Sequence, residues 1–269
     1  MPELPEMETY RMLLSQRMLH QPIVTVEVER EKSINVPVAA FRQRVEARFV
    51  TGISRRAKHL LFHLDSGEIL LLHLMLGGWM FYGTEEEKPD RTTQVVLSFG
   101  QRNLYFIGLR LGFLHLLSRE EADSRLAELG PEPLEPGFSE ADLQRRLMRK
   151  RTMLKPALAD QKTIAGIGNC YSDEICFDAG LLPTRKTYSL SPSDFGALYR
   201  SMNRVLREAI RFGGYMEDPL FPGDALTGGV NSRCTVYDRG GEPCIRCGSP
   251  IVQEELASRK VFYCTSCQH

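Results

Sequence analysis

Gly130–Gly137, which reads Gly-Pro-Glu-Pro-Leu-Glu-Pro-Gly, divides the sequence into two parts of different character. Three closely spaced prolines stiffen the main chain and disfavour regular structure, so this stretch predicts an extended connector between domains. We therefore expect a first domain at residues 1–129 and a hinge at 130–138. With 269 residues, the chain is long enough to form two such cores.

The part before the connector is patterned for short antiparallel strands. Residues 23–28 alternate between apolar and polar side chains, and Asp65-Ser66-Gly67 separates two β-rich runs. Such turn-linked strands are typical of an antiparallel sandwich or barrel. The predicted strands are 23–28, 58–64, 68–76, 93–99 and 103–107, and the predicted helices are 4–19, 38–49 and 119–129.

The part after the connector is patterned for helices. Ser139 followed by Asp142 is typical of a capping box, and the helix that it opens carries a basic cluster at 145–151. Short helices are predicted at 152–160 and 169–179, and Ser191-Pro192 opens a long amphipathic helix that ends at Gly213. We assign residues 139–233 to this domain. They include a Gly-, Pro- and Asp-rich loop at 213–233 that is too long to be a simple connection.

The last segment, residues 234–269, contains two Cys-x-x-Cys pairs separated by sixteen residues. Each pair can place two thiolates on one metal ion, and the β-prone stretch between the pairs can form a hairpin. The alternatives are two disulfides or four free thiols. We expect one structural Zn²⁺, because four thiolates leave no open coordination position for chemistry. The predicted ligands are Cys244, Cys247, Cys264 and Cys267.

Composition restricts the class of protein. The chain has 34 basic and 34 acidic residues and 42% hydrophobic residues, as a globular protein does. It contains neither a signal-peptide pattern nor an apolar run long enough for a membrane span, so we expect a cytoplasmic protein. Zero net charge argues mildly against a nucleic-acid partner. Local basic clusters such as Arg55-Arg56-Ala57-Lys58 and Arg259-Lys260 are nevertheless sufficient to bind phosphates.

The N-terminal residues Pro2, Glu3 and Glu6 are candidates for catalysis. Removal of Met1 would leave Pro2 with a free secondary amine, a nucleophile that can form a covalent iminium intermediate. Glu3 can move protons at the same centre, and Glu6 follows Pro5 near a predicted helix N-terminus. The alternative is an ordinary frayed terminus.

Three further features are ambiguous when taken alone. Gly166-Ile167-Gly168-Asn169 stands at a predicted helix start, where free amides suit a phosphate, but most such stretches are only turns. His73 lies in an apolar run, where a histidine is more often a core residue than a ligand. Lys58 is by default a surface lysine.

Taken together, these motifs resemble the formamidopyrimidine-DNA glycosylase family over essentially the whole chain. The resemblance rests on residues 2–6, 56–58, 129–134 and 166–169 and on the four-cysteine finger. It implies an α+β fold: an N-terminal helix with a two-sheet antiparallel β-sandwich, then a helix-two-turn-helix domain with a C-terminal zinc-finger hairpin. It also implies double-stranded DNA containing a damaged base or an abasic site as the partner, and a monomer.

The resemblance also implies residue roles. Pro2 resembles the nucleophile that attacks C1′, Glu3 the acid that protonates the opening sugar, and Glu6 a residue that organises the terminus. Lys58, Asn169 and Arg259 resemble phosphate-binding residues beside the lesion. Lys155 resembles a lysine at the rim of the active site, and His73 belongs to a stretch that contacts DNA.

Two stretches depart from the family pattern. The family typically has His-Leu-Gly-Met-Ser-Gly and Asp-Pro-Arg-Arg-Phe-Gly where this chain has residues 73–78 and 107–112. The Met, Arg and Phe that fill the void left by a flipped base therefore align with Leu76, Leu109 and Leu111, beside Arg110. Leucine can wedge into a base stack but cannot read a base by hydrogen bonds. We expect altered lesion and opposite-base selectivity.

Three hypotheses follow. The first is a bifunctional DNA glycosylase and AP lyase of base-excision repair that forms a Schiff base through Pro2 and cuts the strand by β,δ-elimination. The second is a non-catalytic or weakly catalytic paralogue that binds DNA damage. The third is a glycosylase for oxidised pyrimidines like the endonuclease VIII branch. Leu4 and Lys155 argue against this hypothesis.

Overall fold

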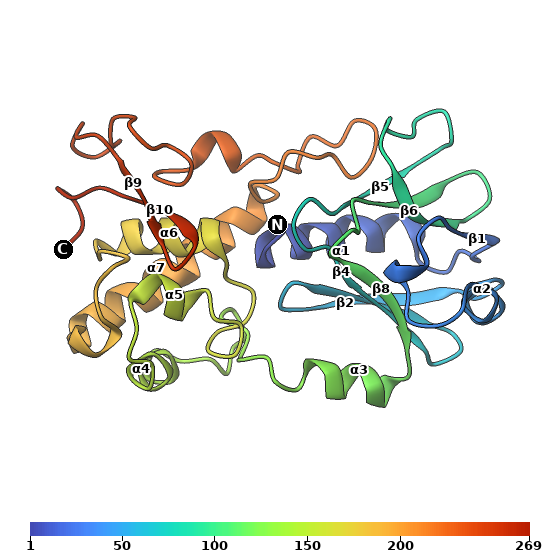
Figure 1. Cartoon of the computed structure of the whole chain (residues 1–269), viewed down its shortest axis with the longest axis horizontal. Helices are drawn as coiled ribbons and strands as arrows, with labels where there is room; N and C mark the ends of the chain where they lie inside the picture. The colour runs from blue at the N-terminus through green and yellow to red at the C-terminus, as the bar shows by residue number, and fades with distance from the viewer. The chain divides into compact units, whose positions relative to one another are not determined.

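The computed structural model describes every residue from Met1 to His269, and the chain divides into two units (Figure 1). The N-terminal unit contains Met1–Ala127 and Met216–Gly229, and the C-terminal unit contains Glu128–Tyr215 and Val230–His269. None of the helices combines the length and the apolar composition needed to cross a bilayer.

The N-terminal unit is a two-sheet antiparallel sandwich with a helix at its start, as the sequence predicted. One sheet has the order β1-β6-β7-β5 and the other β2-β3-β4-β8. Side chains of both sheets share one core; the rings of Phe62 and Phe106, from different sheets, meet edge to face at 6.4 Å. The elements are α1 (Leu4–Met18), β1 (Thr25–Val28), η1 (Glu31–Ser33), α2 (Val38–Val45), β2 (Val50–Arg56), β3 (His59–Leu64), β4 (Ile69–His73), β5 (Trp79–Gly83), β6 (Thr93–Ser98), β7 (Asn103–Ile107), β8 (Phe113–Leu117) and α3 (Arg119–Leu126).

Three strands of this sandwich, β2, β5 and β8, were not predicted from sequence, and the helix expected at 38–49 is shorter. It ends at Val45, because Glu46 adopts an extended conformation and Ala47 has a positive φ of 61°. The Glu46 carboxylate then accepts a hydrogen bond from the Val26 main-chain N–H at 3.0 Å. A contact across twenty residues therefore ends the helix before its local pattern does.

The C-terminal unit is helical, with a two-stranded hairpin near its end. Capping boxes open α4 and α7, and Gly180 (φ 72°) ends α6 in the left-handed conformation. One apolar core joins these helices, and a smaller cluster joins Phe177 of α6 to the cysteine-rich segment. The elements are α4 (Glu140–Met148), α5 (Leu154–Leu158), α6 (Asn169–Ala179), η2 (Thr187–Ser189), α7 (Pro192–Arg211), η3 (Asn231–Arg233), β9 (Val252–Leu256) and β10 (Arg259–Tyr263).

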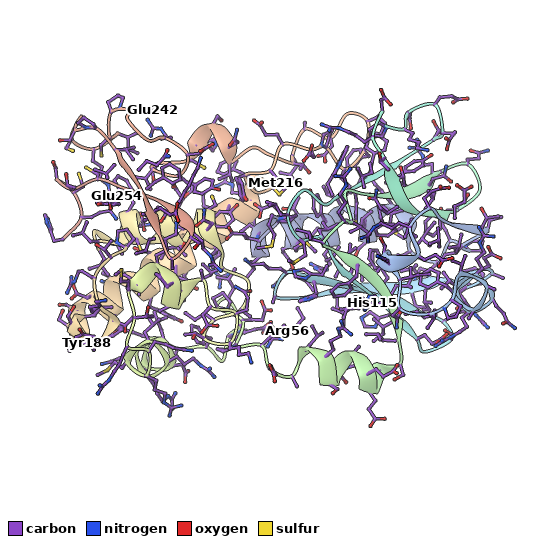
Figure 2. All side chains as sticks on the ribbon, in the orientation of Figure 1. Arg56, His115, Tyr188, Met216, Glu242 and Glu254 are labelled. Carbon is purple, nitrogen blue, oxygen red and sulfur yellow. The ribbon has the colours of Figure 1, made fainter.

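The division of the chain differs from the sequence-based domain limits in two places. The expected hinge at 130–138 belongs to the C-terminal unit, where the Gly130 main-chain N–H donates to the Gln161 carbonyl and Phe138 is buried. Residues 216–229, expected with the helical domain, fold with the N-terminal unit. Met216, labelled in Figure 2, is where the chain passes into that unit. Both differences arise from contacts between segments that are distant in the sequence, which composition does not reveal.

Candidate functional site

The first turn of α1 is built around two buried carboxylates. Glu3 is the N-cap of the helix and forms a reciprocal capping box with Glu6. The Glu3 main-chain N–H donates to Glu6 Oε2 at 2.7 Å, and the two residues are only 1% and 0% exposed. The N-terminus of a helix stabilises negative charge, so both groups suit this position. Two carboxylates are therefore held directly after Pro2, which is itself buried.

A buried phenol lies one helical turn further along α1. Tyr10 is fully buried and its hydroxyl has no hydrogen-bond partner. Burial, and then the negative charge of Glu6, raise the pKa of Tyr10. The helix thus carries the carboxylates and a neutral phenol on one face.

Lys58 is placed by a tight turn between β2 and β3. Arg56 pairs with His59, so the turn consists of Ala57 and Lys58, and Ala57 takes a positive φ of 53°. Lys58 is 4% exposed, which contradicts the default interpretation as a solvated surface lysine. An ammonium group held in this way has lost much of its hydration and interacts more strongly with an approaching anion.

His73 lies at the end of β4, where its ring stands 4.3 Å from that of His59 and 5.7 Å from that of Phe113. Burial, and then the positive charge of Lys58, lower the pKa of His73 to about 4. The imidazole is therefore neutral near pH 7. It can offer a hydrogen bond, but not a charge, to a phosphate.

The loops that carry Leu76 and Leu111 lie against each other. A Cβ on Gly108 would stand 2.0 Å from the Gly77 carbonyl oxygen, and one on Gly112 would stand 2.3 Å from the His73 carbonyl oxygen. Only glycine allows this approach of two main chains. Leu76 and Leu111 are 68% and 65% exposed, as side chains that insert into DNA need to be.

Leu109 does not share this exposure, so its expected role as a void-filling side chain is not supported. It is fully buried in the sandwich core. Its main-chain N–H donates to Gln94 Oε1 at 2.8 Å, and its carbonyl accepts from Ser33 Oγ at 3.4 Å. Leu109 anchors the loop, and the next residue, Arg110, is exposed.

In the C-terminal unit, Asn169 is the first residue of α6 and follows a turn braced by a side chain. Gln161 Oε1 accepts from the Gly166 main-chain N–H at 2.9 Å, and Gln161 Nε2 donates to the Ile167 carbonyl at 2.6 Å. The Asn169 Oδ1 atom is buried without a hydrogen-bond partner. Gln161 was not identified from sequence, because it lies five residues outside the glycine motif.

Lys155 and Arg259 have different surroundings, although both were expected near DNA. Arg259 is exposed where β10 begins. Lys155 is only 2% exposed, and its Nζ lies 2.7 Å from Asp173 Oδ2. Burial raises the pKa of Asp173, although the charge of Lys155 opposes this effect. Lys155 is therefore part of a buried ion pair and does not project from the surface.

Glu174 anchors the segment that leads to the cysteines. Its carboxylate accepts hydrogen bonds from the main-chain N–H groups of Thr235, Val236 and Tyr237 at 2.8–3.1 Å. A caged carboxylate of this kind rigidifies the chain where it enters the finger. Asp173 and Glu174 were not identified from sequence, although two adjacent acids in the middle of a predicted helix were an available signal.

The four predicted cysteines meet at one point. Their Sγ atoms all lie within 4.8 Å of one another, with Cys244–Cys267 at 3.9 Å and Cys247–Cys264 at 3.5 Å. A tetrahedral Zn²⁺ with bonds of about 2.3 Å to sulfur requires sulfur–sulfur distances of about 3.8 Å. The residues therefore fit a zinc ion, and β9 and β10 form the predicted hairpin between the two pairs.

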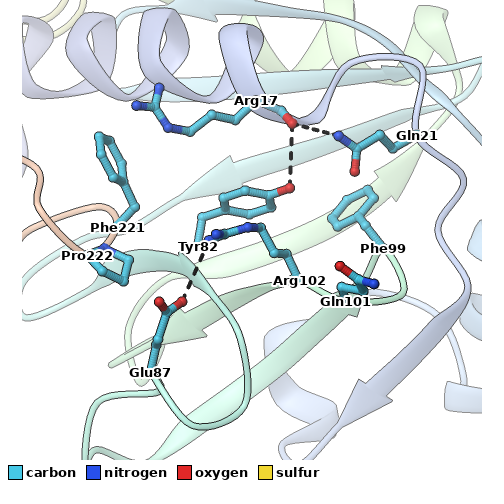
Figure 3. Close-up of a pocket in the computed structure, with 9 residues that line it drawn as sticks. All are labelled: Arg17, Gln21, Tyr82, Glu87, Phe99, Gln101, Arg102, Phe221 and Pro222. Carbon is cyan, nitrogen blue, oxygen red and sulfur yellow. Dashed lines mark hydrogen bonds and ion pairs between the residues drawn. The ribbon is translucent and has the colours of Figure 1, made fainter.

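The loop 216–229 is attached to the sandwich by an apolar anchor. Leu220 is fully buried in the core, and its carbonyl accepts from the Tyr82 main-chain N–H at 2.6 Å. The Arg17 guanidinium lies 3.6 Å above the centre of the Phe221 ring. Beside these residues is a cavity of about 540 Å³ (Figure 3).

Comparison with known proteins agrees with this arrangement. The family descriptions that match are the formamidopyrimidine-DNA glycosylase N-terminal domain at residues 1–113, the H2TH domain of the same glycosylase at 129–218, and the zinc finger found in FPG and IleRS at 241–269. This order of a sandwich, a helical domain and a zinc finger defines a class of DNA-repair glycosylases.

Individual relatives cover the whole chain. The formamidopyrimidine-DNA glycosylases of Desulfitobacterium hafniense (strain DSM 10664 / DCB-2) and Geobacillus kaustophilus (strain HTA426) are both 38% identical, over 100% of both chains in each case. The Lactococcus lactis Fpg in complex with an abasic-site-containing DNA has a TM-score of 0.92 and 28% identity over 99% of each chain. The chain belongs to the formamidopyrimidine-DNA glycosylase family.

Proposed function

We propose that this member of the family is a bifunctional enzyme, a DNA glycosylase that is also an AP lyase. The observation that carries the proposal is the start of α1, where Pro2 is followed by the buried, reciprocally bonded Glu3 and Glu6. A secondary amine next to a proton donor is the arrangement that imine chemistry at a sugar carbon requires.

The reaction begins once Met1 is removed. The Pro2 nitrogen forms a bond to C1′ as the bond to the damaged base breaks. The base leaves with the electron pair of that bond and gains a proton, while the Pro2 nitrogen loses its own proton. Glu3 gives a proton to the ring oxygen O4′ as the sugar opens to the iminium ion. The iminium ion acidifies the proton on C2′, and loss of this proton expels the 3′ phosphate. Loss of a proton from C4′ then expels the 5′ phosphate. Each step needs only proton transfer and no redox partner.

Phosphate binding is proposed for residues of both units. Lys58 supplies a partly desolvated charge, Asn169 is the first residue of α6, and Arg259 is exposed at the hairpin. Charge-assisted contacts of this kind orient a duplex and offset the cost of extruding a base. Their partner is double-stranded DNA with a damaged base or an abasic site.

Void filling is proposed for Leu76 and Leu111, the exposed leucines of the two contacting loops. Arg110, between the buried Leu109 and Leu111, is the guanidinium available in this stretch for hydrogen bonds to a base. Selectivity for the opposite base then depends on Arg110. The sequence alignment had instead placed Leu109 at the position of the family's base-reading arginine, with Arg110 as a neighbouring DNA-binding residue.

The zinc finger holds one structural Zn²⁺ in the proposal. The ion would be bound by Cys244, Cys247, Cys264 and Cys267 and would fix the finger in the conformation that supports β9 and β10. The chemistry of base release runs on Pro2 and Glu3. A cytoplasmic location and a monomeric state stay predictions.

The test is borohydride trapping on a duplex with an abasic site. Wild type should form a covalent adduct that maps to Pro2, whereas Pro2→Gly and Glu3→Gln should lose it or form it far more slowly. Glu31→Gln, an exposed carboxylate outside α1, is the matched control and should trap as wild type does. Mass spectrometry of the same samples reports the loss of Met1.

The second candidate is a paralogue that binds DNA damage without turnover, and the aliphatic tips of the two loops favour it. It would be supported by tight binding to the abasic duplex without any adduct, from protein shown to lack Met1. Excision measured opposite all four bases then tests selectivity. A strong preference for cytosine opposite the lesion 8-oxoguanine would contradict the altered selectivity that we expect from the two departing stretches at 73–78 and 107–112.

A further inference from the structure

Lys155 connects three elements of the C-terminal unit at a point that is closed to solvent. Its ammonium donates to Asp173 Oδ2 of α6 at 2.7 Å and to the Lys260 main-chain carbonyl of β10 at 2.5 Å. Asp173 is 0% exposed, and the same Oδ2 accepts from the Phe262 main-chain N–H at 3.2 Å. The ion pair therefore binds β10 through one carbonyl and one amide.

These two main-chain groups lie on the edge of β10 that has no neighbouring strand. β10 pairs with β9 on one side only, and Lys260 and Phe262 are alternate residues, so their main-chain groups point the same way. Lys155 and Asp173 thus take the place of a third strand. They satisfy an edge that would otherwise be open.

The edge lies immediately beside Arg259. This residue begins β10 after a two-residue turn in which Ala257 and Ser258 both have positive φ, 51° and 59°. Leu256, Ala257 and Arg259 also line a cavity of about 470 Å³ next to α5. Lys155 and Pro156 of α5 line the same cavity. The hydrogen bond from Lys155 to the Lys260 carbonyl attaches the hairpin to α5 at the residue that follows Arg259.

The same link reaches the start of α6. Asp173 lies four residues after Asn169, so the two side chains lie on one face of the helix, one turn apart. Asp173 is thus joined through α6 to one proposed phosphate-binding residue and through β10 to the other.

Burying an ammonium and a carboxylate is costly, and an apolar pair of the same volume usually stabilises a fold at least as well. Asp173 Oδ1 has no hydrogen-bond partner, which adds to that cost. A role in fixing geometry accounts for the pair better than stability does.

We propose that Lys155 and Asp173 are positioning residues for Arg259, and that neither contacts DNA. The proposal rests on the phosphate-binding role proposed for Arg259. It also changes the role of Lys155, which was expected to lie at the rim of the active site and to bind DNA directly.

The sharpest variant is Asp173→Asn, which keeps the volume and removes one negative charge. If the charge acted on DNA only through space, its removal would tighten DNA binding. Positioning predicts the opposite, since the asparagine no longer holds the Lys155 ammonium. We expect binding to a duplex with a tetrahydrofuran abasic analogue to weaken by about tenfold, the effect of losing one charge-assisted phosphate contact. Tighter binding would overturn the proposal.

A double-mutant cycle identifies the group through which the pair acts. Lys155→Met and Arg259→Ala should each weaken binding by a similar factor, and the double variant should bind about as Arg259→Ala does. Lys155→Met should also reduce the slope of log K against log salt by about 0.9, the value for one phosphate, but not in the Arg259→Ala background. Independent, multiplying effects would mean that Lys155 contacts DNA itself, and the proposal would be wrong.

The controls separate this inference from misfolding and from the proposed chemistry. Asp178→Asn lies on the same helix in a partly exposed ion pair with Arg204, and it should leave binding unchanged. Zinc content and thermal stability show whether each variant is folded; if Lys155→Met loses zinc, Asp173→Asn decides. Borohydride trapping at saturating protein reports the Pro2 chemistry separately. Unchanged binding by Arg259→Ala would overturn the positioning role while leaving that chemistry intact.

Discussion

Replacing Leu220 by alanine should release the loop 216–229 while the sandwich stays folded. The Leu220 side chain is fully buried in the core, and truncating such a leucine costs about 2.7–5 kcal/mol. The other contacts of the loop are weaker: the Tyr82 hydrogen bond contributes about 1 kcal/mol and the stacking of Arg17 on Phe221 about 1 kcal/mol. Leu220 therefore supplies most of the free energy of docking. Its loss should raise the undocked population by about 100-fold or more, since each 1.4 kcal/mol is a factor of ten.

Hydrogen exchange measures this population directly. The Tyr82 amide donates to the Leu220 carbonyl, so it should exchange at least about 100-fold faster in Leu220→Ala, while amides of β3 keep their protection. The resemblance to the glycosylase family implies that this loop covers the flipped base, so we expect excision of a damaged base to fall more than cleavage at a preformed abasic site. Leu226→Ala, a partly buried leucine of the same loop, is the matched control and should have a smaller effect.

Three results would each contradict a part of this reasoning. If β3 and the loop lost protection together, the loop and the sandwich would be one cooperative unit. If the Tyr82 amide kept its protection, burial of Leu220 would not be what holds the loop. If base excision and abasic-site cleavage fell equally, docking of the loop would not contribute to recognition of the damaged base.

Three further predictions concern other parts of the molecule. Burial lowers the pKa of His59 to about 3, and burial also lowers the pKa of His73 and His115 to about 4, so the folded state binds fewer protons than an unfolded chain with a pKa of about 6.5. The free energy of unfolding should therefore be greatest above pH 6.5 and fall below it, by about 1.4 kcal/mol at pH 5.5 for His59 alone. In His59→Phe the melting temperature should depend less on pH between 7.5 and 5.5. The same pH dependence as in wild type would contradict this prediction. Leu111→Ala should change the free energy of unfolding by less than about 0.5 kcal/mol, since the side chain is exposed, but it should lower the rate of base excision. Arg110→Ala should reduce discrimination among opposite bases. Excision equal to wild type in both variants would argue against the roles proposed for these residues. A chelator should release one zinc ion per chain and weaken DNA binding, and Cys264→Ser should also lose zinc and bind DNA more weakly. A variant of the buried Cys234, which lies outside the cluster, should retain the zinc ion.

Local patterns in the sequence were enough for several elements. The capping boxes at Ser139 and Ser191 and the left-handed Gly180 fixed where helices begin and end, because each acts on main-chain groups within a few residues. The spacing of the cysteines predicted the hairpin and the metal site for the same reason. The motif at Pro2–Glu6 predicted two acids at a helix start, and the structure adds that they bond each other.

Only the tertiary structure shows the contacts between segments that are distant in the sequence. Leu109 and Leu111 are two identical residues two positions apart, yet one is buried and the other exposed, because Leu109 meets Ser33 and Gln94. Lys155 is an ordinary lysine in the sequence, and its role depends on Asp173 and on Lys260, more than a hundred residues away. Sequence alone determined the chemistry that the chain carries, because reactive groups and metal ligands are residue types. The folded structure determined which of those groups face a partner, because burial depends on neighbours that the linear order does not bring together.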